Sequence, residues 1–341
     1  MAEAQSLDLE DAAWFAHRYD EAVDSFRFIH VPRDLHDNIT FLTDEYLPQG
    51  LDQQIVDRNK ITNIPANEAP LHFIFHSGFC CSTLLNRALN QPGIATSLSE
   101  PTILRDIVGY KGRGAHSEKL YAVLHHALHL LARPFEQGES VVVKPSCIVN
   151  GLQNQILTMR PDSHAVFLYA PIRVFLNSIA RKGITGRTWG RELFLGLQKA
   201  SRTELGFSDD KLFGQTDLQI AGLAWLIQNI QFAVLLDEFG EARVRSLDSE
   251  TFISRPAETL ERVGSLFGLS LGSEQASAIA DSDVFRRHSK FGDDFDAGQR
   301  EQARASGENA HADEIEKVAQ WVESVAQGLN ATVTPGGSLM D

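Results

Sequence analysis

Short apolar runs alternate with amphipathic segments through the middle of the chain. Residues 71–76 (LHFIFH) form an aromatic-rich apolar run that stops at Ser77-Gly78, the pattern of a strand buried on both faces. The next segment has leucines at helical spacing and ends at Pro92-Gly93, which predicts a helix. The same order continues, with further strands predicted at 93–98, 140–145, 163–170 and 241–247 and helices at 119–132, 150–159, 172–183, 216–239 and 256–269.

Strands that alternate with helices through short connections predict the fold class. Consecutive parallel strands need a crossover connection, and a crossover helix covers one face of the sheet. We therefore expect an α/β protein in which a parallel sheet carries helices on both faces. This core is predicted to span residues 67–270.

The two ends of the chain lie outside this pattern. Residues 1–66 combine a predicted amphipathic helix at Asp11–Ala22 with short apolar pieces and a Pro/Asn-rich linker, so we expect a lid or accessory layer without chemistry of its own. Residues 271–341 are predicted to form a helical extension and a tail. Within them, the polar stretch 289–312 is expected to be a loop or arm, and 314–329 an amphipathic helix.

Composition narrows the class of protein. Of 341 residues, 43% are hydrophobic and 22% are charged, which is typical of a globular chain with a substantial core. No apolar stretch reaches the length of a membrane span, and the acidic N-terminus lacks the basic and apolar regions of a signal peptide. Three cysteines do not make a disulfide framework, so we expect a cytoplasmic protein without a membrane partner.

Charge is unevenly distributed along the chain. The net charge of −14 argues against a nucleic-acid partner. Residues 140–191 nevertheless contain a single acid, Asp162, and have a net charge of +6. This segment is interpreted as a site for a small anion, although buried strands within it would also exclude acids. Its bases are Lys144, Arg160, Arg173, Arg181, Lys182, Arg187 and Arg191.

The first predicted strand leads into a candidate phosphate loop. Strand FIFH, loop SGFCC and helix STLLNRAL place a turn and a helix N-terminus at the carboxyl edge of the sheet. Unpaired N–H groups and the positive end of the helix dipole favour a phosphate there, and Ser82 and Thr83 add hydroxyl donors. The loop is not a Walker A motif, because the Gly-Lys step is absent.

Four segments, read together, resemble the sulfotransferase family. HSGFCCSTLLNRALNQPG resembles the opening motif of sulfotransferases, and Glu100 follows Ser82 at a spacing similar to that of the glutamate base in tyrosylprotein sulfotransferases. APIRVFLNSIARKG resembles the second family signature, and VRSLDSETFISRPAETLERVGSLFGL resembles a later family stretch. The resemblance covers about residues 71–270, with the segments in the family's order.

This resemblance implies a P-loop NTPase-like, sulfotransferase-like fold and a sulfuryl transfer from 3′-phosphoadenosine 5′-phosphosulfate to a hydroxyl or amine of a small-molecule acceptor. Glu100 would be the base. The 5′-phosphosulfate would be held by the loop, and the 3′-phosphate by residues of the second signature. The implied donor-binding residues are Ser77, Gly78, Phe79, Cys80, Cys81, Ser82 and Thr83 of the loop, with Arg173, Ser178, Arg181 and Lys182.

The sequence departs from the family at positions that matter for the donor. Phe79 stands where the family has a loop lysine or arginine, Cys81 replaces a loop glycine, and Ala170 replaces an arginine that binds the 3′-phosphate. A neutral ring cannot stabilise charge on a transferring group. Lys144, which ends a strand at the same edge, is the first candidate to replace the missing cation.

Other bases are candidates for the same role. Arg187, with Arg181 and Lys182, is expected to form a glycine-punctuated basic loop that closes over phosphates. Lys290 is a weaker candidate, for which a solvated basic turn is the simpler interpretation.

Phosphoryl transfer from ATP is a further possible function, but the absence of a Walker lysine disfavours it. Two other classes of function also remain open on the sequence. One is a catalytically altered protein that keeps the fold as a nucleotide sensor or interaction module, as Phe79 and Ala170 suggest. The other is a thiol or soft-metal site, because Cys80, Cys81 and Cys147 are expected at one sheet edge near His76. Their spacing does not match a metal motif, so no metal is expected.

Overall fold

The computed structural model describes residues 7–63, 69–201, 203–286 and 297–341. At its centre is a five-stranded sheet in the order β5-β6-β4-β7-β8, and every neighbouring pair is parallel. This confirms the predicted parallel sheet, and each predicted strand is present within a few residues. The strands are β4 (Leu71–His76), β5 (Ala95–Ser99), β6 (Ser140–Lys144), β7 (Ala165–Tyr169) and β8 (Val244–Asp248).

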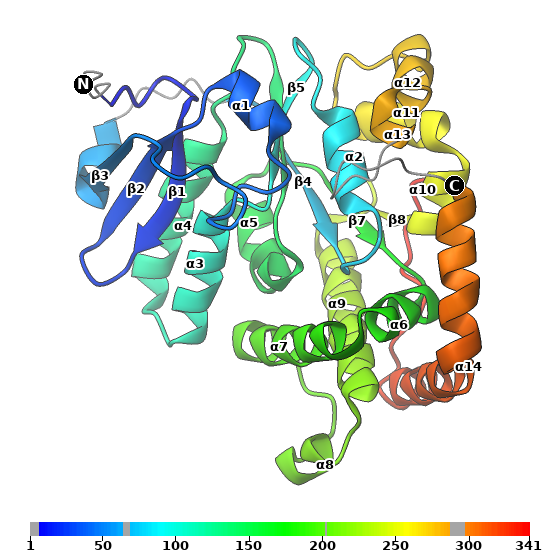
Figure 1. The fold of residues 1–341 in the computed structure, drawn as a ribbon. Coiled ribbons are helices and arrows are strands. Elements are labelled where there is room, and N and C mark those ends of the chain that lie inside the picture. Colours follow the sequence, from blue (N-terminus) through cyan, green and yellow to red (C-terminus); the bar gives the residue numbers. More distant parts are fainter. Residues whose placement is uncertain (1–6, 64–68, 202, 287–296) are drawn as a thin grey trace.

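Helices cover both faces of the sheet, as predicted (Figure 1). Along β4, Phe73 and Phe75 pack into the core on one face, and Ile74 packs into the core on the other. Successive side chains of a strand point to opposite faces, so a strand buried on both faces must be apolar throughout. One face carries α2 (Ser82–Leu89), α6 (Ile172–Arg181) and α11 (Pro256–Leu266), and the other carries α3 (Thr102–Gly112), α4 (Ser117–Leu131) and α5 (Gln153–Met159).

The N-terminal residues form an antiparallel sheet, not the predicted helix at Asp11–Ala22. Strand β1 (Trp14–Asp20) pairs with β2 (Ser25–His30), which pairs with β3 (Gln53–Asp57). The β1 register shifts between Ala16 and Arg18, so a bulge interrupts the two-residue alternation of buried positions. The helical interpretation was therefore wrong because the bulge made the apolar spacing look helical. Helix α1 (Arg33–Asn38) and the 3₁₀ turn η1 (Arg58–Asn63) complete this layer.

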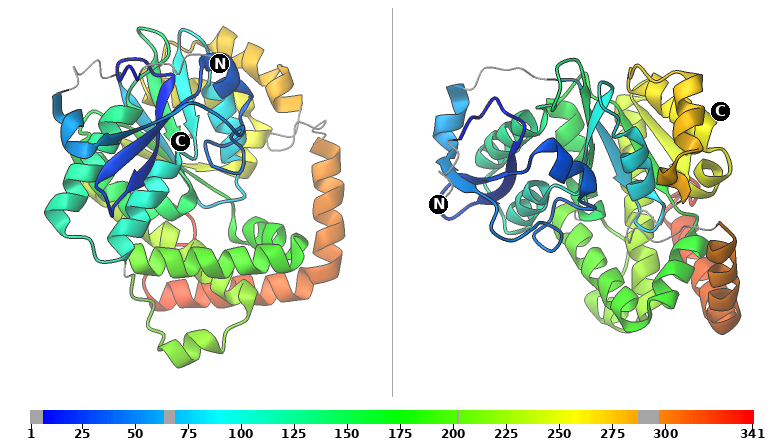
Figure 2. Two further views of the ribbon diagram at one scale, coloured as in Figure 1. Left: turned by 60° about the vertical axis from the view of Figure 1, so that its left-hand side comes forward. Right: turned by 45° about the horizontal axis from the view of Figure 1, so that its top comes forward.

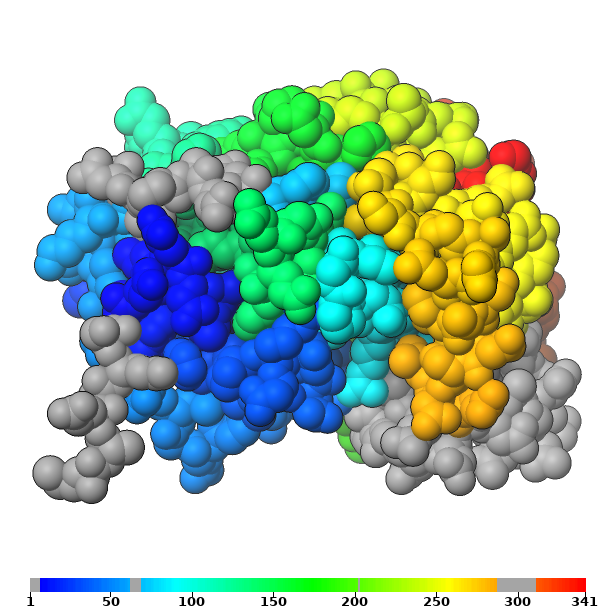
Figure 3. Space-filling model, turned by 90° about the horizontal axis from the view of Figure 1, so that it is seen from above, coloured from blue at the N-terminus to red at the C-terminus, as the bar shows by residue number. Residues whose placement is uncertain are grey.

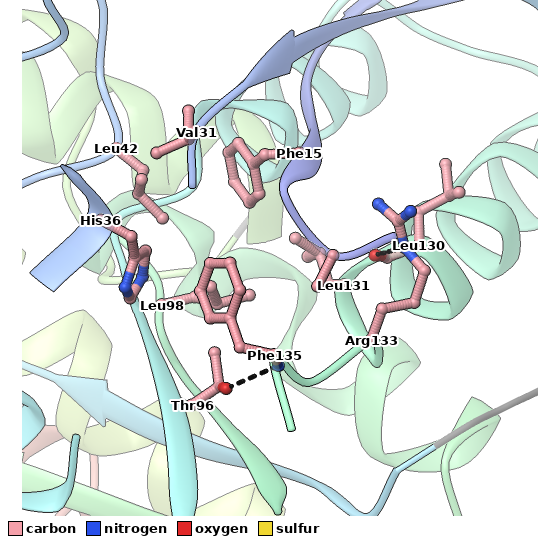
Figure 4. A pocket seen from close by; sticks show the side chains of 11 residues that line it. Phe15, Val31, His36, Leu42, Thr96, Leu98, Leu130, Leu131, Arg133 and Phe135 are labelled. Atoms are coloured by element: carbon pink, nitrogen blue, oxygen red, sulfur yellow. Dashed lines mark hydrogen bonds between the residues drawn. The ribbon is translucent and has the colours of Figure 1, made fainter. Parts of the chain in front are cut away.

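A small pocket of about 10 Å³ lies between this layer and the main sheet (Figure 4). Phe15 and Val31 from the N-terminal layer face Leu98 and Phe135 across it. Arg133 fixes this junction by donating hydrogen bonds to the backbone carbonyls of Leu9, Asp11, Trp14 and Leu130.

The C-terminal part packs on the far side of the sheet from this layer. Viewed from above, the N-terminal layer (blue) and residues 256–286 (yellow to gold) lie at opposite sides of the molecule (Figure 3). Residues 289–312 were predicted to be a loop or arm, but residues 297–312 are helical, so this prediction was wrong there. Alanine, glutamine and glutamate in this stretch favour helix. Residues 287–296, which include Lys290, lie outside the described residues. The elements here are α10 (Ser249–Ser254), α12 (Ser273–Ala280), α13 (Asp283–Arg286) and α14 (Ala297–Gly328).

Helices α7 (Gly183–Ser201) and α8 (Asp209–Phe213) lie beyond the carboxyl edge of the sheet (Figure 2). Helix α9 (Asp217–Phe239) runs from there onto a face of the sheet, where Phe232 stacks on Phe167 of β7. Among the described residues, α9 is the helix whose length and composition would allow it to cross a membrane. However, 72% of its most apolar window is buried inside the protein, where Trp225 and Phe232 pack into the core.

Acidification is expected to destabilise the fold through His72, which is 3% exposed and stacks on Phe267. Burial, with a smaller contribution from neighbouring His164, lowers the pKa of His72 from 6.5 to about 4. Between these values the unfolded chain binds a proton that the folded protein excludes, so stability falls as the pH falls. The expected loss of unfolding free energy is roughly 3 kcal/mol by pH 4.

Urea unfolding of the wild type and of His72→Asn, measured from pH 7.5 to pH 4.5, checks this expectation. Asparagine keeps an acceptor for the His164 amide, which donates to His72 Nδ1 at 3.2 Å. The variant should lose less stability over this pH range. Equal losses in the two proteins would assign the pH dependence to other groups.

Candidate functional site

The carboxyl ends of the parallel strands bring the candidate residues to one edge of the sheet. Glu100 follows β5, Lys144 ends β6, and the loop Ser77–Cys81 follows β4, so the three lie on consecutive strands. In Figure 1 this edge faces α6 and α7. Ligands of open α/β sheets bind in this position, outside the carboxyl ends of the strands.

Glu100 and Lys144 form an ion pair at this edge. The Lys144 Nζ lies 2.6 Å from Glu100 Oε1, and the side chain of Lys144 is 0% exposed while that of Glu100 is 22% exposed. The Glu100 amide also donates to the Lys144 carbonyl at 2.7 Å. Glu100 has a φ of +53°, a left-handed backbone that a non-glycine residue adopts at a cost. The glutamate is therefore held in a defined position, with one side open to solvent.

A segment from the N-terminal layer covers this ion pair. Lys144 Nζ lies 4.9 Å from the centre of the Phe41 ring. The Leu42 amide donates to the Ser99 carbonyl at 2.7 Å, and Thr102 Oγ1 donates to the Leu42 carbonyl at 3.0 Å. Sequence reasoning assigned no chemistry to residues 1–66 and missed Phe41. The apolar piece ITFLTDEYL was the available signal, but it does not show which strand end it covers.

The loop after β4 is built from unusual backbone conformations. Gly78, Phe79 and Cys81 have φ values of +85°, +53° and +62°. Cys81 is the N-cap of α2, so the first N–H groups of the helix lack partners within it. Turns of this kind orient successive amides toward one point and suit an anion. Ser82 and Thr83, in the first turn of α2, are 6% and 3% exposed.

Hydrogen bonds from neighbouring elements hold the base of the loop. His76 Nδ1 accepts from the Gly78 amide at 3.1 Å, so Nε2 carries the proton and donates to the Pro145 carbonyl at 2.9 Å. Asn150 Nδ2 donates to the His76 carbonyl at 3.0 Å, and Gln228 Nε2 donates to the Ser77 carbonyl at 3.3 Å. The start of the loop is therefore fixed before any ligand binds.

Ala170 also takes part in fixing the loop. Its amide donates to Ser77 Oγ at 3.1 Å, and its carbonyl accepts from Trp225 Nε1 at 2.8 Å. Its side chain is 0% exposed. The backbone at this position supports Ser77, and the position offers no cation to a phosphate.

The Trp189 and Lys182 side chains pack on Phe79 in this loop. The Phe79 ring contacts the Trp189 ring edge-on at a centroid distance of 4.9 Å, and Lys182 Nζ lies 5.7 Å from the centre of the Phe79 ring. Lys182 thus brings a cation close to the loop at Phe79. Trp189, on α7, was missed by sequence reasoning because nothing local shows that α7 folds back over β4.

Replacing Gly78 with alanine is expected to lower the unfolding free energy by about 1–3 kcal/mol. An added Cβ would lie 2.9 Å from Trp189 Cη2, and the φ of +85° is already unfavourable for alanine. Urea unfolding measures the loss. Gly138→Ala is the matched control, since Gly138 has a φ of +92° and nothing within 4 Å of the added atom. Equal losses in the two variants would show that Trp189 exerts no steric constraint.

Two of the predicted phosphate-binding arginines pair with α14. Arg173 contacts Glu316 at 2.8 Å and Glu323 at 2.6 Å, and these carboxylates raise the pKa of Arg173. Arg187 contacts Glu314 at 2.9 Å. The structure therefore places both guanidinium groups against carboxylates of the C-terminal helix.

The rest of the predicted basic loop is helical. Residues 181–187 lie at the junction of α6 and α7, where Gly183 has a φ of +57°, so the expectation of a loop was wrong. Ser178 Oγ donates to the Val174 carbonyl at 2.9 Å, and Arg181 is exposed. Of this group, Lys182 is the residue that the structure places over the loop after β4.

The cysteines follow neighbouring strands at the same edge, and the two buried ones, Cys80 and Cys147, are not activated. Cys147 Sγ lies 3.9 Å from where a Cβ on Gly78 would be. Burial raises the pKa of Cys80 to about 11 and that of Cys147 to about 12. Both thiols are protonated at neutral pH, and the thiolate is the nucleophilic form. Within the described part of the chain, no three His, Cys, Asp or Glu side chains are grouped to hold a metal ion.

Three solved structures that are similar to this chain are described here. No family model matches the chain, and neither does any curated protein. The chain is similar to the sulfotransferase domain of the Synechococcus PCC 7002 olefin synthase, with 15% identity, 65% of this chain and 81% of that chain covered, and a TM-score of 0.39. It is also similar to the sulfotransferase domain of the curacin biosynthetic pathway, with 11% identity, 78% and 99% covered, and a TM-score of 0.39. A sulfotransferase from Mycobacterium tuberculosis H37Rv matches at 15% identity, with 63% of this chain and 72% of that chain covered and a TM-score of 0.42.

Proposed function

We propose that this protein transfers a sulfuryl group from 3′-phosphoadenosine 5′-phosphosulfate to a hydroxyl or amine of a small-molecule acceptor. The observation that carries the proposal is the Glu100–Lys144 ion pair, which lies at the carboxyl edge of the sheet, on strands beside the phosphate loop. A carboxylate and a cation in contact at such an edge provide a proton acceptor and a charge-stabilising group in one place.

Each residue has a distinct role in the proposed reaction. Glu100 accepts the proton of the acceptor hydroxyl or amine as the acceptor atom forms its bond to sulfur. The bond between sulfur and the bridging oxygen of the 5′-phosphate breaks, and its electron pair leaves with adenosine 3′,5′-bisphosphate. Lys144, whose desolvated ammonium lies against Glu100, stabilises the negative charge that develops on the transferring group and the leaving oxygen.

The loop and the side chains that lie over it supply the groups that would hold the donor. The N-terminal amides of α2 and the hydroxyls of Ser82 and Thr83 would bind the 5′-phosphate. Lys182, over Phe79, would supply the cation that the loop itself lacks. Ser178 and Arg181, on α6, would face the 3′-phosphate.

Calorimetric titration with adenosine 3′,5′-bisphosphate tests the donor assignment. We expect micromolar binding by the wild type and at least tenfold weaker binding by Lys182→Ala. Lys211→Ala is the matched control, because Lys211 is an exposed lysine on α8, away from the sheet edge. Tight binding of Mg·ATP with no binding of the bisphosphate would replace sulfuryl transfer by phosphoryl transfer.

A second function is favoured by the pairing of Arg173 and Arg187 with α14. If these contacts are permanent, the fold serves as an interaction module and has lost donor binding. The same titration separates the two functions, since neither the bisphosphate nor ATP would bind. Glu316→Gln removes one of the two carboxylates that pair with Arg173. If the protein is an interaction module, this variant should still bind neither nucleotide.

A further inference from the structure

The segment that covers the ion pair of the proposed site belongs to no helix or sheet. It comprises residues 39–47, and we call it the cover segment. Its position therefore depends on individual contacts with its neighbours. Two of these contacts join it to the residues on either side of Glu100. The Leu42 amide donates to the Ser99 carbonyl at 2.7 Å, and Thr102 Oγ1 donates to the Leu42 carbonyl at 3.0 Å.

The cover segment places an aromatic ring against the Lys144 ammonium. The centre of the Phe41 ring lies 4.9 Å from Lys144 Nζ, and Phe41 is 9% exposed. Tyr46, from the same segment, packs edge-on against Phe41 at a centroid distance of 4.9 Å. A cation over an aromatic face is attracted by it, and more strongly where water is excluded. Phe41 therefore both attracts the ammonium and keeps water away from it.

Three residues after Phe41, the carboxylate of Asp44 is held by the N-terminal sheet. Its Oδ1 accepts from His17 Nε2 at 2.7 Å, and its Oδ2 accepts from Arg18 Nη1 at 2.6 Å. The Arg27 guanidinium lies 3.7 Å from Oδ1. The His17 side chain is 2% exposed, and its Nδ1 has no partner in the part of the chain that the structure describes. Asp44 is therefore the acceptor toward which this buried ring is oriented.

Arg18 joins the cover segment to α3, the helix that begins two residues after Glu100. Its Nε and Nη2 donate to Asp106 Oδ2 and Oδ1 at 2.7 and 2.9 Å, while its Nη1 donates to Asp44. A planar guanidinium can bind two carboxylates in this way, whereas a lysine ammonium is a single point charge. The cover segment is thus tied to the helix after Glu100 through both Leu42 and Asp44.

We propose that Asp44 is a positioning residue for the reaction proposed above. Its contacts with β1 fix the cover segment, which holds Phe41 against Lys144 and keeps that ammonium beside Glu100. A shift of the segment would let water reach the ammonium. Water would weaken its interaction with Glu100 and with the charge that develops on the transferring group. The effect on rate rests on the proposed function, whereas the position of Lys144 does not.

Acetylation of Lys144 by a water-soluble N-hydroxysuccinimide ester of acetate, followed by peptide mass spectrometry, tests this position in the full chain without a nucleotide. The wild type should react slowly, because the Lys144 side chain is 0% exposed. Asparagine has a single acceptor oxygen and cannot satisfy both donors of β1, so Asp44→Asn should react at least about fivefold faster through local opening. Equal rates in the wild type and Asp44→Asn would overturn the proposal.

Asp57→Asn is the matched control for this experiment. Asp57 is an exposed aspartate of the same N-terminal layer and lies 3.3 Å from Lys60. Its variant removes a comparable ion pair and should leave the acetylation of Lys144 at the wild-type rate. Alkylation of Cys80, which is 0% exposed, reports general opening in the same samples. A parallel acceleration at Cys80 in Asp44→Asn would overturn the proposal, because it would reflect a general loss of structure.

A double-mutant cycle tests whether Asp44 acts through Phe41. Phe41→Leu keeps an apolar side chain but removes the aromatic face, so it should also accelerate the acetylation of Lys144. Adding Asp44→Asn to Phe41→Leu should then change the rate by less than about twofold, because the two residues act in one chain of contacts. Effects that multiply in full would show that Asp44 acts by another route and would overturn the proposal.

Sulfuryl transfer gives the second readout. Asp44→Asn should lower kcat by about ten- to a hundredfold, since a small displacement of a reacting group has effects of this size. Binding of adenosine 3′,5′-bisphosphate should remain at the wild-type value, because the phosphate loop is not part of the cover segment. An unchanged kcat would overturn the proposal. Absence of transfer by the wild type to every acceptor would contradict the proposed function, and acetylation would still decide whether Asp44 positions Lys144.

Discussion

Replacing Glu100 with glutamine is expected to slow sulfuryl transfer by about 10²–10⁴-fold, the usual contribution of a positioned general base. Glutamine has the shape of glutamate and keeps an oxygen for Lys144 Nζ, which lies 2.6 Å from Glu100 Oε1. It cannot take up a proton from the acceptor. The measurement is the initial rate of transfer from labelled donor to a panel of hydroxyl and amine acceptors.

The binding of adenosine 3′,5′-bisphosphate to Glu100→Gln serves as the control for this result, and it should match that of the wild type. Glu136→Gln changes an exposed glutamate away from the sheet edge and should leave the rate unchanged. A transfer rate that survives Glu100→Gln would remove this residue from the chemistry. Lys144→Met would then show whether the lysine acts without it.

Replacing Glu139 with alanine is expected to lower the unfolding free energy by about 3–5 kcal/mol, as is usual when one partner of a buried ion pair is removed. The Glu139 side chain is 0% exposed and lies 2.9 Å from Arg33 Nη1, whose side chain is 20% exposed. Glu139 also accepts from the Gly93 amide at 2.9 Å and from Thr96 Oγ1. Its loss would leave the Gly93 amide and the Thr96 hydroxyl without this acceptor, and Arg33 would keep only Asp37, at 3.3 Å.

Urea unfolding of Glu139→Ala and of Glu136→Ala checks this prediction. The two residues are three apart, but Glu136 is exposed, so its variant should remain within about 0.5 kcal/mol of the wild type. Because Arg33 lies on α1 and Glu139 precedes β6, the loss should also loosen the N-terminal layer from the sheet. Hydrogen exchange in β1 and β2 would report this loosening, and unchanged exchange would contradict it.

The five strands of the main sheet could be predicted because burial on both faces constrains their composition directly. A stretch such as LHFIFH or SVVVK has apolar side chains pointing both ways, and few other structures accept that pattern. The bulged strand β1 could not be predicted in the same way, since its register depends on pairing with β2 and an extra residue breaks its alternation.

The location of the candidate site could be predicted from the alternation of strands and helices. Residues that end parallel strands meet at one edge, so Glu100, Lys144 and the loop after β4 were expected there before their contacts were known. The partners of the cations were not predictable. Arg173 pairs with Glu316, which is 143 residues away in the chain, and Lys182 lies over Phe79, about a hundred residues away.

The amino-acid sequence by itself therefore determined the α/β class, the strands of the parallel sheet and the edge at which its chemistry gathers. These follow from local periodicity, because each strand or helix shows its own buried face in its own residues. Only the tertiary structure decided that Phe41 and Trp189 cover the site and that α14 engages Arg173 and Arg187. These contacts join segments far apart in the chain, and no local pattern records which distant partner a side chain meets.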